Sequence, residues 1–122
     1  MNGSRLLSSF VNGFGKAEFS DIINAAYIAK SVLKLNFPFS FESRGSRGVD
    51  SSEIRKILFF GKYKTGKNHK EAYRAAEQLS KVDSKQLGWL AQYIMNGKTH
   101  LYEEEAKKAL VIKKNLSKIA PK

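Results

Sequence analysis

The sequence predicts an all-α protein, a compact bundle of about five short helices with a basic loop between two of them. Apolar residues recur at spacings of three and four along most of the chain, which is the period of an amphipathic helix. Capping residues and stop glycines separate these stretches. With 122 residues, 42% of them hydrophobic, the chain suits one core, so residues 1–122 are expected to form a single helical domain.

Two helices are expected in the first third of the chain. A short helix from about Ser4 should stop near Gly13, and a longer one should follow the N-cap Ser20 through FSDIINAAYIAKSVLKL. Phenylalanines then alternate around Pro38 in NFPFSFE. Because proline disfavours helix in the residue before it, this segment is predicted to be extended and partly buried.

The middle of the chain should combine a basic loop with another helix. Residues 43–52, SRGSRGVDSS, are rich in Ser, Gly and Arg and are predicted to form a flexible basic loop. Asp50 and Glu53 have the spacing of a capping box, and Gly61 stands where a helix commonly ends. A helix is therefore expected between Asp50 and Gly61.

Three further helices are expected in the second half. One should begin at Asn68, one should run from Asp83 to Gly97, and the last should run from about Thr99 to Ala120. Glutamates near the start of the last helix and lysines near its end suit the helix dipole.

The charge of the chain favours a polyanionic partner. Lys and Arg number 22 against 11 Asp and Glu, a net charge of +11. Residues 43–74 carry nine basic and three acidic groups, a net of +6 in one segment. Such an excess most often serves nucleic acid, and less often an anionic membrane or an acidic protein.

Other features of the composition limit which class of protein this is and where in the cell it is expected. No apolar run is long enough for a membrane span. The absence of cysteine removes disulfides, thiolate catalysis and cysteine-based zinc sites. These features fit an intracellular protein, cytoplasmic or, in a eukaryotic or viral source, nuclear.

The stretch GKYKTGKN, residues 61–68, nearly spells a phosphate-binding loop. Asn68 stands where that motif needs a hydroxyl to hold magnesium. The preceding EIRKILFF fits a capped helix better than the buried strand the motif requires, and no later strand could hold the metal. The sequence therefore predicts a lysine-rich loop and not a nucleotide-hydrolysing site.

Catalytic and metal-binding signatures are not found in the sequence. His69 and His100 stand far apart, without a carboxylate at a spacing that suggests a metal. No Ser-His-Asp, Cys-His or paired-carboxylate arrangement can be argued. We therefore expect a non-enzyme that uses no metal and no cofactor.

A helix-turn-helix is an alternative for AAEQLSKVDSKQLGWLAQYI. In that arrangement Lys85, Gln86 and Gln92 could reach base edges in the major groove. The apolar spacing across the turn is one residue too long, and the turn lacks the glycine that often occupies it. Trp89 is expected in the core or in a subunit contact.

These observations together predict a non-catalytic nucleic-acid-binding protein that contacts the phosphate backbone, with Tyr63 able to stack on a base. The sequence does not distinguish DNA from RNA. Two alternatives are a small basic regulator or inhibitor that docks on an acidic protein surface, and a homo-oligomeric assembly protein whose FPFSF segment packs on a neighbouring subunit. The expected nucleic-acid-binding residues are Arg44, Arg47, Lys62, Tyr63, Lys64, Lys67, Lys70, Arg74, Lys85, Gln86, Lys113 and Lys114.

Overall fold

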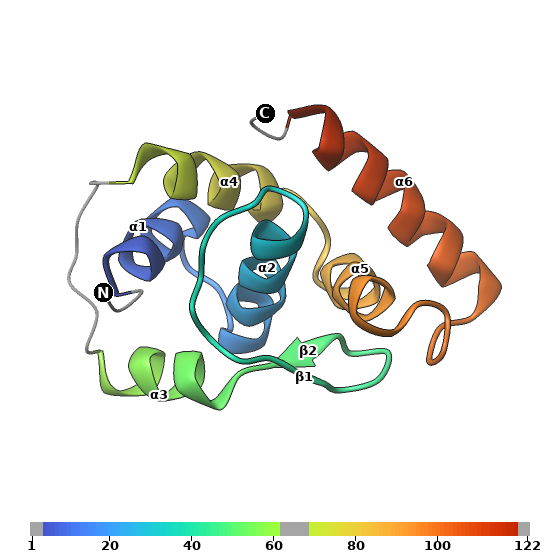
Figure 1. Ribbon diagram of the computed structural model, residues 1–122, viewed down its shortest axis with the longest axis horizontal. Coiled ribbons are helices and arrows are strands. Elements are labelled where there is room, and N and C mark those ends of the chain that lie inside the picture. The colour runs from blue at the N-terminus through green and yellow to red at the C-terminus, as the bar shows by residue number, and fades with distance from the viewer. Residues whose placement is uncertain (1–3, 62–68, 120–122) are drawn as a thin grey trace.

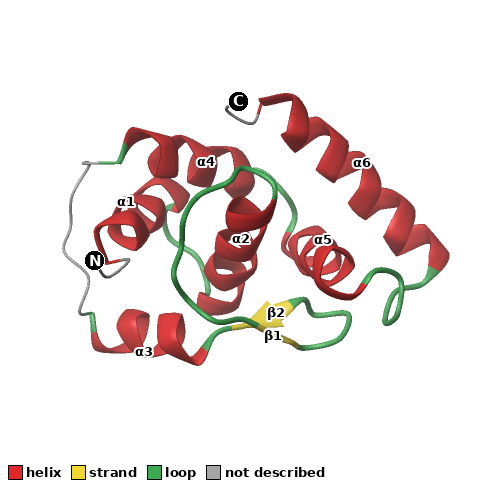
Figure 2. Ribbon diagram, in the orientation of Figure 1, coloured by secondary structure: helices red, strands yellow, loops and turns green. Residues whose placement is uncertain are grey.

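The computed structural model describes residues 4–61 and 69–119, and these ranges are mostly helical (Figures 1 and 2). The helical class is confirmed, but the expected count of about five is wrong, because the described ranges hold six helices and a small antiparallel sheet. The elements are α1 (Ser4–Phe14), α2 (Phe19–Ser31), β1 (Glu42–Ser43), β2 (Val49–Asp50), α3 (Ser52–Phe60), α4 (Lys70–Ser80), α5 (Ser84–Asn96) and α6 (Glu103–Ile119).

Helix α2 lies at the centre of the molecule and is covered by the other elements (Figure 1). Its apolar side chains are buried, and three of them are alanines, which let neighbouring backbones come close. Helices α1 and α4 pack together on one side, and α5, with α6 outside it, lies on the other. At the α1–α4 contact, a side chain on Gly13 would overlap the backbone of Tyr73. The glycine therefore sets how closely these two helices approach.

The segment after α2 wraps around the core without forming a helix, as Figure 1 shows. Phe37 is 1% exposed and Phe39 is 7% exposed, while Pro38 between them is exposed, so the predicted extended, partly buried segment is confirmed. The Phe37 ring packs edge-on against Phe10, with 5.3 Å between ring centroids. The expectation that FPFSF packs on another subunit is wrong for Phe37 and Phe39, because this chain's own core buries both side chains.

Several predicted helix ends are confirmed. Asp83 precedes α5 and its carboxylate accepts a hydrogen bond from the Lys85 N–H at 3.1 Å. Gly61 ends α3 with a φ of 62° and Gly97 ends α5 with a φ of 67°. Both values lie in the left-handed region that a side chain disfavours.

Other expected helix ends are wrong. Helix α2 begins one residue earlier than its proposed cap, so Ser20 lies inside it. Helix α3 is capped by Ser51, whose hydroxyl accepts from the Ile54 N–H at 3.3 Å, and not by Asp50. Asp50 instead binds the guanidinium of Arg55. The proposed cap at Asn68 lies outside the described residues.

Residues 43–52, expected as an irregular loop, contain most of a small hairpin. Its strands pair in antiparallel register, Glu42 with Asp50 and Ser43 with Val49. The Arg44 N–H donates to the Gly48 carbonyl at 2.8 Å, which closes the turn. The flexibility of this segment stays a prediction, and the sheet, with two residues in each strand, leaves the all-α class unchanged. No helix within the described ranges combines the length and apolar character that a bilayer span requires.

Candidate functional site

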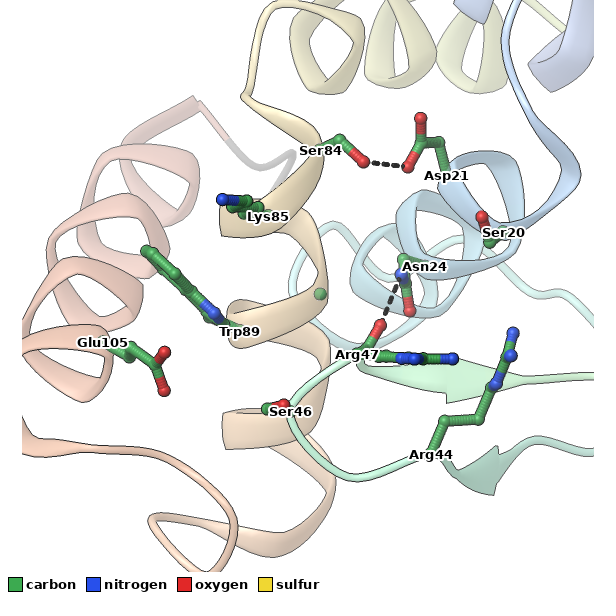
Figure 3. A pocket seen from close by; sticks show the side chains of 11 residues that line it. Ser20, Asp21, Asn24, Arg44, Ser46, Arg47, Ser84, Lys85, Trp89 and Glu105 are labelled. Carbon is green, nitrogen blue, oxygen red and sulfur yellow. Dashed lines mark hydrogen bonds between the residues drawn. The ribbon is translucent and has the colours of Figure 1, made fainter.

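The predicted residues Arg44, Arg47 and Lys85 line one pocket of about 470 Å³. The pocket lies where the hairpin turn meets the first halves of α2 and α5, and it extends to α6 (Figure 3). Arg44 and Arg47 come from the turn, while Lys85 comes from a helix about 40 residues later in the chain. The rest of its lining is polar apart from the indole of Trp89 and the backbone at Gly88.

Asn24 of α2 fixes the hairpin turn through backbone atoms. Its side chain is 3% exposed. The Nδ2 group donates to the Arg47 carbonyl at 3.1 Å, and Oδ1 accepts from the Val49 N–H at 2.8 Å. Gly48 adopts a φ of 104°, and a Cβ there would overlap the Asn24 amide. A glycine is therefore required for the turn to meet this asparagine.

The same turn rests on α5 at two points. A Cβ on Gly88 would lie 2.7 Å from the Arg47 carbonyl oxygen, so the turn can come this close to α5 only at a residue without a side chain. One turn further along, the Ser43 hydroxyl donates to Gln92 Oε1 at 2.9 Å. The arginines are thus carried by a turn that two helices hold from different sides.

The burial of Gln92 corrects part of the helix-turn-helix hypothesis. This side chain is 0% exposed and binds the hairpin, so it cannot reach base edges. Helix α5 is also covered by α2, by the hairpin and by α6, as Figure 1 shows. The face of α5 that carries Gln92 is therefore not available to enter the major groove.

The three cations at the pocket form no ion pair within the described part of the chain, although the charge of Arg44 acts on Asp50. Ion pairs in residues 4–61 and 69–119 join Arg55 to Asp50 and Lys107 to Glu103. Arg44, Arg47 and Lys85 are all exposed. In Figure 3 both arginine side chains extend beneath the start of α2, whereas Lys85 projects from the face of α5 toward α6. A pocket lined by three cations, none of which forms an ion pair among these residues, favours the binding of an anion.

Two carboxylates also line the pocket, and each is already engaged through one oxygen. Asp21 Oδ1 accepts from the Ser84 hydroxyl at 2.5 Å. Glu105 Oε1 accepts from the Tyr102 N–H at 3.1 Å, which caps the start of α6. Neither carboxylate is therefore placed as the salt-bridge partner of an arginine, and each keeps a second oxygen for a ligand.

Trp89, which was expected in the core or in a subunit contact, packs against the core and also lines the pocket. Its side chain is half-buried, and its ring lies 5.7 Å from the ammonium of Lys108, measured to the centroid. It lies beside Lys85 and Glu105 in Figure 3. One feature of the sequence indicates that Trp89 lies near a predicted binding residue: Lys85 and Trp89 are four residues apart and so share one helix face.

The remaining predicted residues lie elsewhere. Gln86 is half-buried on α5 and does not line this pocket. Lys70 and Arg74 of α4 line a smaller pocket of about 300 Å³ with Tyr73 and Glu77. Lys113 and Lys114, expected on the last helix, are exposed on α6. The predicted residues of the lysine-rich loop lie outside the described residues: Lys62, Tyr63, Lys64 and Lys67.

No protein-family model, curated protein or solved structure gives a match to this chain.

Proposed function

We propose that this protein is a non-catalytic nucleic-acid-binding protein whose pocket at the hairpin turn contacts the phosphate backbone. The observation that carries the proposal is that Arg44, Arg47 and Lys85 line one pocket and that none of them forms an ion pair among the described residues. Nucleic acid supplies closely spaced phosphates, which match several cations at once.

The residue types at the turn support phosphate as the bound group. A guanidinium offers donors in a planar fork that fits two phosphate oxygens, and it stays charged at any physiological pH. Arg44 and Arg47 project from a turn that Asn24 and Gly88 hold in place. Their mutual repulsion is relieved when an anion lies between them, because the two like charges then share one counter-charge.

The charge of the whole chain supports a polymeric ligand over an isolated anion. A net charge of +11 attracts a polyanion over distances of about 8–10 Å at physiological salt. Lys70 and Arg74 on α4 and the lysines of α6 extend the basic surface beyond the pocket. These residues would add affinity without sequence preference.

Removal of the two turn arginines tests the proposal. We expect Arg44→Ala/Arg47→Ala to weaken binding by about tenfold at 100 mM salt, and to lower the slope of log K against log salt by about 2, because two phosphate contacts are lost. Fluorescence anisotropy with labelled single-stranded DNA, duplex DNA and single-stranded RNA, from about 50 to 200 mM salt, measures both quantities.

The matched control removes two positive charges elsewhere. Lys56 on α3 and Lys118 on α6 are exposed and line none of the pockets described above. Lys56→Ala/Lys118→Ala should weaken binding by no more than about threefold, since it alters only the general field. An equal loss in both double variants would contradict the pocket as the site. No binding to any nucleic acid at 50 mM salt would contradict the proposed function itself.

A further inference from the structure

We infer that the pocket accepts an unpaired nucleotide, with its base stacked on Trp89 and the adjacent phosphates at the arginine pair and at Lys85. The ligand is therefore single-stranded at the point of contact. This inference rests on the proposed function and specifies the form of nucleic acid that the site binds.

The position of Trp89 is the first argument. Its half-buried indole lines the same pocket as the three cations and lies beside Lys85 (Figure 3), so the phosphate of a base on the ring would lie near that ammonium. Figure 3 places Lys85 beside the indole and the arginine pair on the other side of α5, under α2. The ammonium of Lys108 lies over the ring, 5.7 Å from its centroid, and this exposed side chain would move aside for a base on that face. An aromatic ring within a positive groove is the usual arrangement of single-strand binding sites.

The mixed lining of the pocket is the second argument. Asp21 and Glu105 each present a carboxylate, and a ligand made only of phosphates would be repelled by them. The N–H groups of a base edge can donate to these oxygens, while the phosphates lie at the cations. A nucleotide carries both kinds of group. The volume of about 470 Å³ also lies within the range of pockets that hold ligands of this size.

The state of the strand follows from the same contacts. In a duplex, the faces of each base are stacked on neighbouring bases, and the Watson–Crick N–H groups are already paired. Only an unpaired base has a free face for Trp89 and free donors for the carboxylates. The pocket should therefore favour a single strand over a duplex of the same charge.

The protein contains one tryptophan, so its intrinsic fluorescence reports on this pocket directly. We expect unlabelled dT₁₂ to quench the emission of Trp89 in the full-length protein as it binds, because a stacked base quenches indole emission. Inorganic polyphosphate of matched length should bind with little quenching. A 12-base-pair duplex should bind about tenfold more weakly than the single strand in the anisotropy assay.

Variants of Trp89 separate stacking from a structural role. Trp89→Leu keeps an apolar side chain but removes the ring, and it should weaken dT₁₂ binding by about tenfold with duplex binding unchanged. Trp89→Phe keeps a smaller ring and should recover most of the affinity. Thermal unfolding followed by circular dichroism checks that both variants fold. If Trp89→Leu does not fold, Trp89→Phe is used alone.

The outcomes distinguish the inference from the proposed function. Equal affinity for single strand and duplex, with Trp89 unquenched by dT₁₂, would overturn the unpaired nucleotide but leave nucleic-acid binding intact. Quenching by polyphosphate as strong as that by dT₁₂ would overturn the stacked base. If neither nucleic acid binds at 50 mM salt, the proposed function fails together with this inference.

Discussion

Asn24 links the central helix to the turn that carries the two arginines. The amide is almost fully buried and satisfies two backbone groups of the turn, the Arg47 carbonyl and the Val49 N–H. An amide is suited to this position because it carries a donor and an acceptor on one side chain. The shape of the pocket therefore depends on a residue of α2 that carries no charge.

We expect Asn24→Ala to lower the free energy of unfolding by about 1–3 kcal/mol. The substitution leaves the buried Val49 N–H without its acceptor, and an unsatisfied buried donor costs about that much. It should also weaken nucleic-acid binding, since the turn is no longer held under α2. Urea denaturation followed by circular dichroism measures the stability. Asn24→Asp keeps the acceptor but sets a carboxylate oxygen against the Arg47 carbonyl, so it should also be less stable than the wild type. An Ala variant as stable as the wild type would contradict this role.

At the scale of elements, Asp50 and Arg55 tie the hairpin to α3. Arg55 donates to Asp50 Oδ1 from Nε at 3.2 Å and from an Nη group at 2.9 Å. Burial alone would raise the pKa of Asp50. The hydrogen bonds from Arg55 and from the Ser51 backbone, together with the charges of Arg55 and Arg44, outweigh it and lower the pKa below its ordinary value of 3.8.

This lowered pKa gives the Asp50–Arg55 contact a defined pH dependence. A carboxyl whose pKa falls on folding stabilises the native state above its unfolded pKa, and that contribution is lost as the pH falls through the folded value. We expect Asp50→Asn to be less stable than the wild type at pH 7, by about 1 kcal/mol or less, because the pair is partly exposed. The difference should shrink as the pH falls from about 5 to 3.

Chemical denaturation at several pH values measures the difference between the two proteins. Glu42→Gln is the matched control, because Glu42 lies opposite Asp50 in the hairpin but forms no ion pair in the described residues. A stability difference for Asp50→Asn that stays constant between pH 7 and pH 3 would contradict the contribution of the ionised pair.

The helices could be predicted from the sequence and the hairpin could not. Helical stretches repeat their apolar pattern over several turns, and Asp83, Gly61 and Gly97 mark their ends locally. Each strand of the hairpin has two residues, too few for an alternating pattern. Its geometry depends on Asn24 and Gln92, which are distant in sequence.

Only some residues of the candidate pocket could be named from the sequence, because contacts between distant segments bring its lining together. Arg44, Arg47 and Lys85 were recognised as basic residues, but the sequence grouped the arginines with the lysines that follow them. The fold instead brings the turn onto α5, where Gly88 permits the approach. Trp89 could not be assigned to the pocket without that contact, because an apolar residue on a helix is most often in the core.

At the scale of the whole molecule, like charges repel one another. The chain carries a net +11, and in residues 4–61 and 69–119 two ion pairs offset part of this repulsion locally. Self-repulsion destabilises the compact state, and salt screens it. We expect the melting temperature to rise by a few degrees between about 20 and 200 mM sodium chloride, as measured by circular dichroism.

A variant with fewer positive charges controls this measurement. Lys113→Gln/Lys114→Gln/Lys118→Gln removes three exposed cations from α6 and should show a shallower salt dependence. A melting temperature that falls with salt in the wild type would mean that attractive ion pairs outweigh the repulsion.

Hydrogen bonds to main-chain atoms hold the hairpin turn. The groups that fix its shape are therefore different from the arginine side chains proposed to bind the ligand. The bonds that fix it use the Arg44 N–H, the carbonyls of Arg47 and Gly48 and the Val49 N–H, and none of them uses a guanidinium. The side chains at positions 44 and 47 are therefore not part of the hydrogen bonds that form the turn, which depends instead on the positive φ of Gly45 and Gly48. Natural variation or protein engineering can exchange these two side chains to change the ligand, with the scaffold beneath them unaltered.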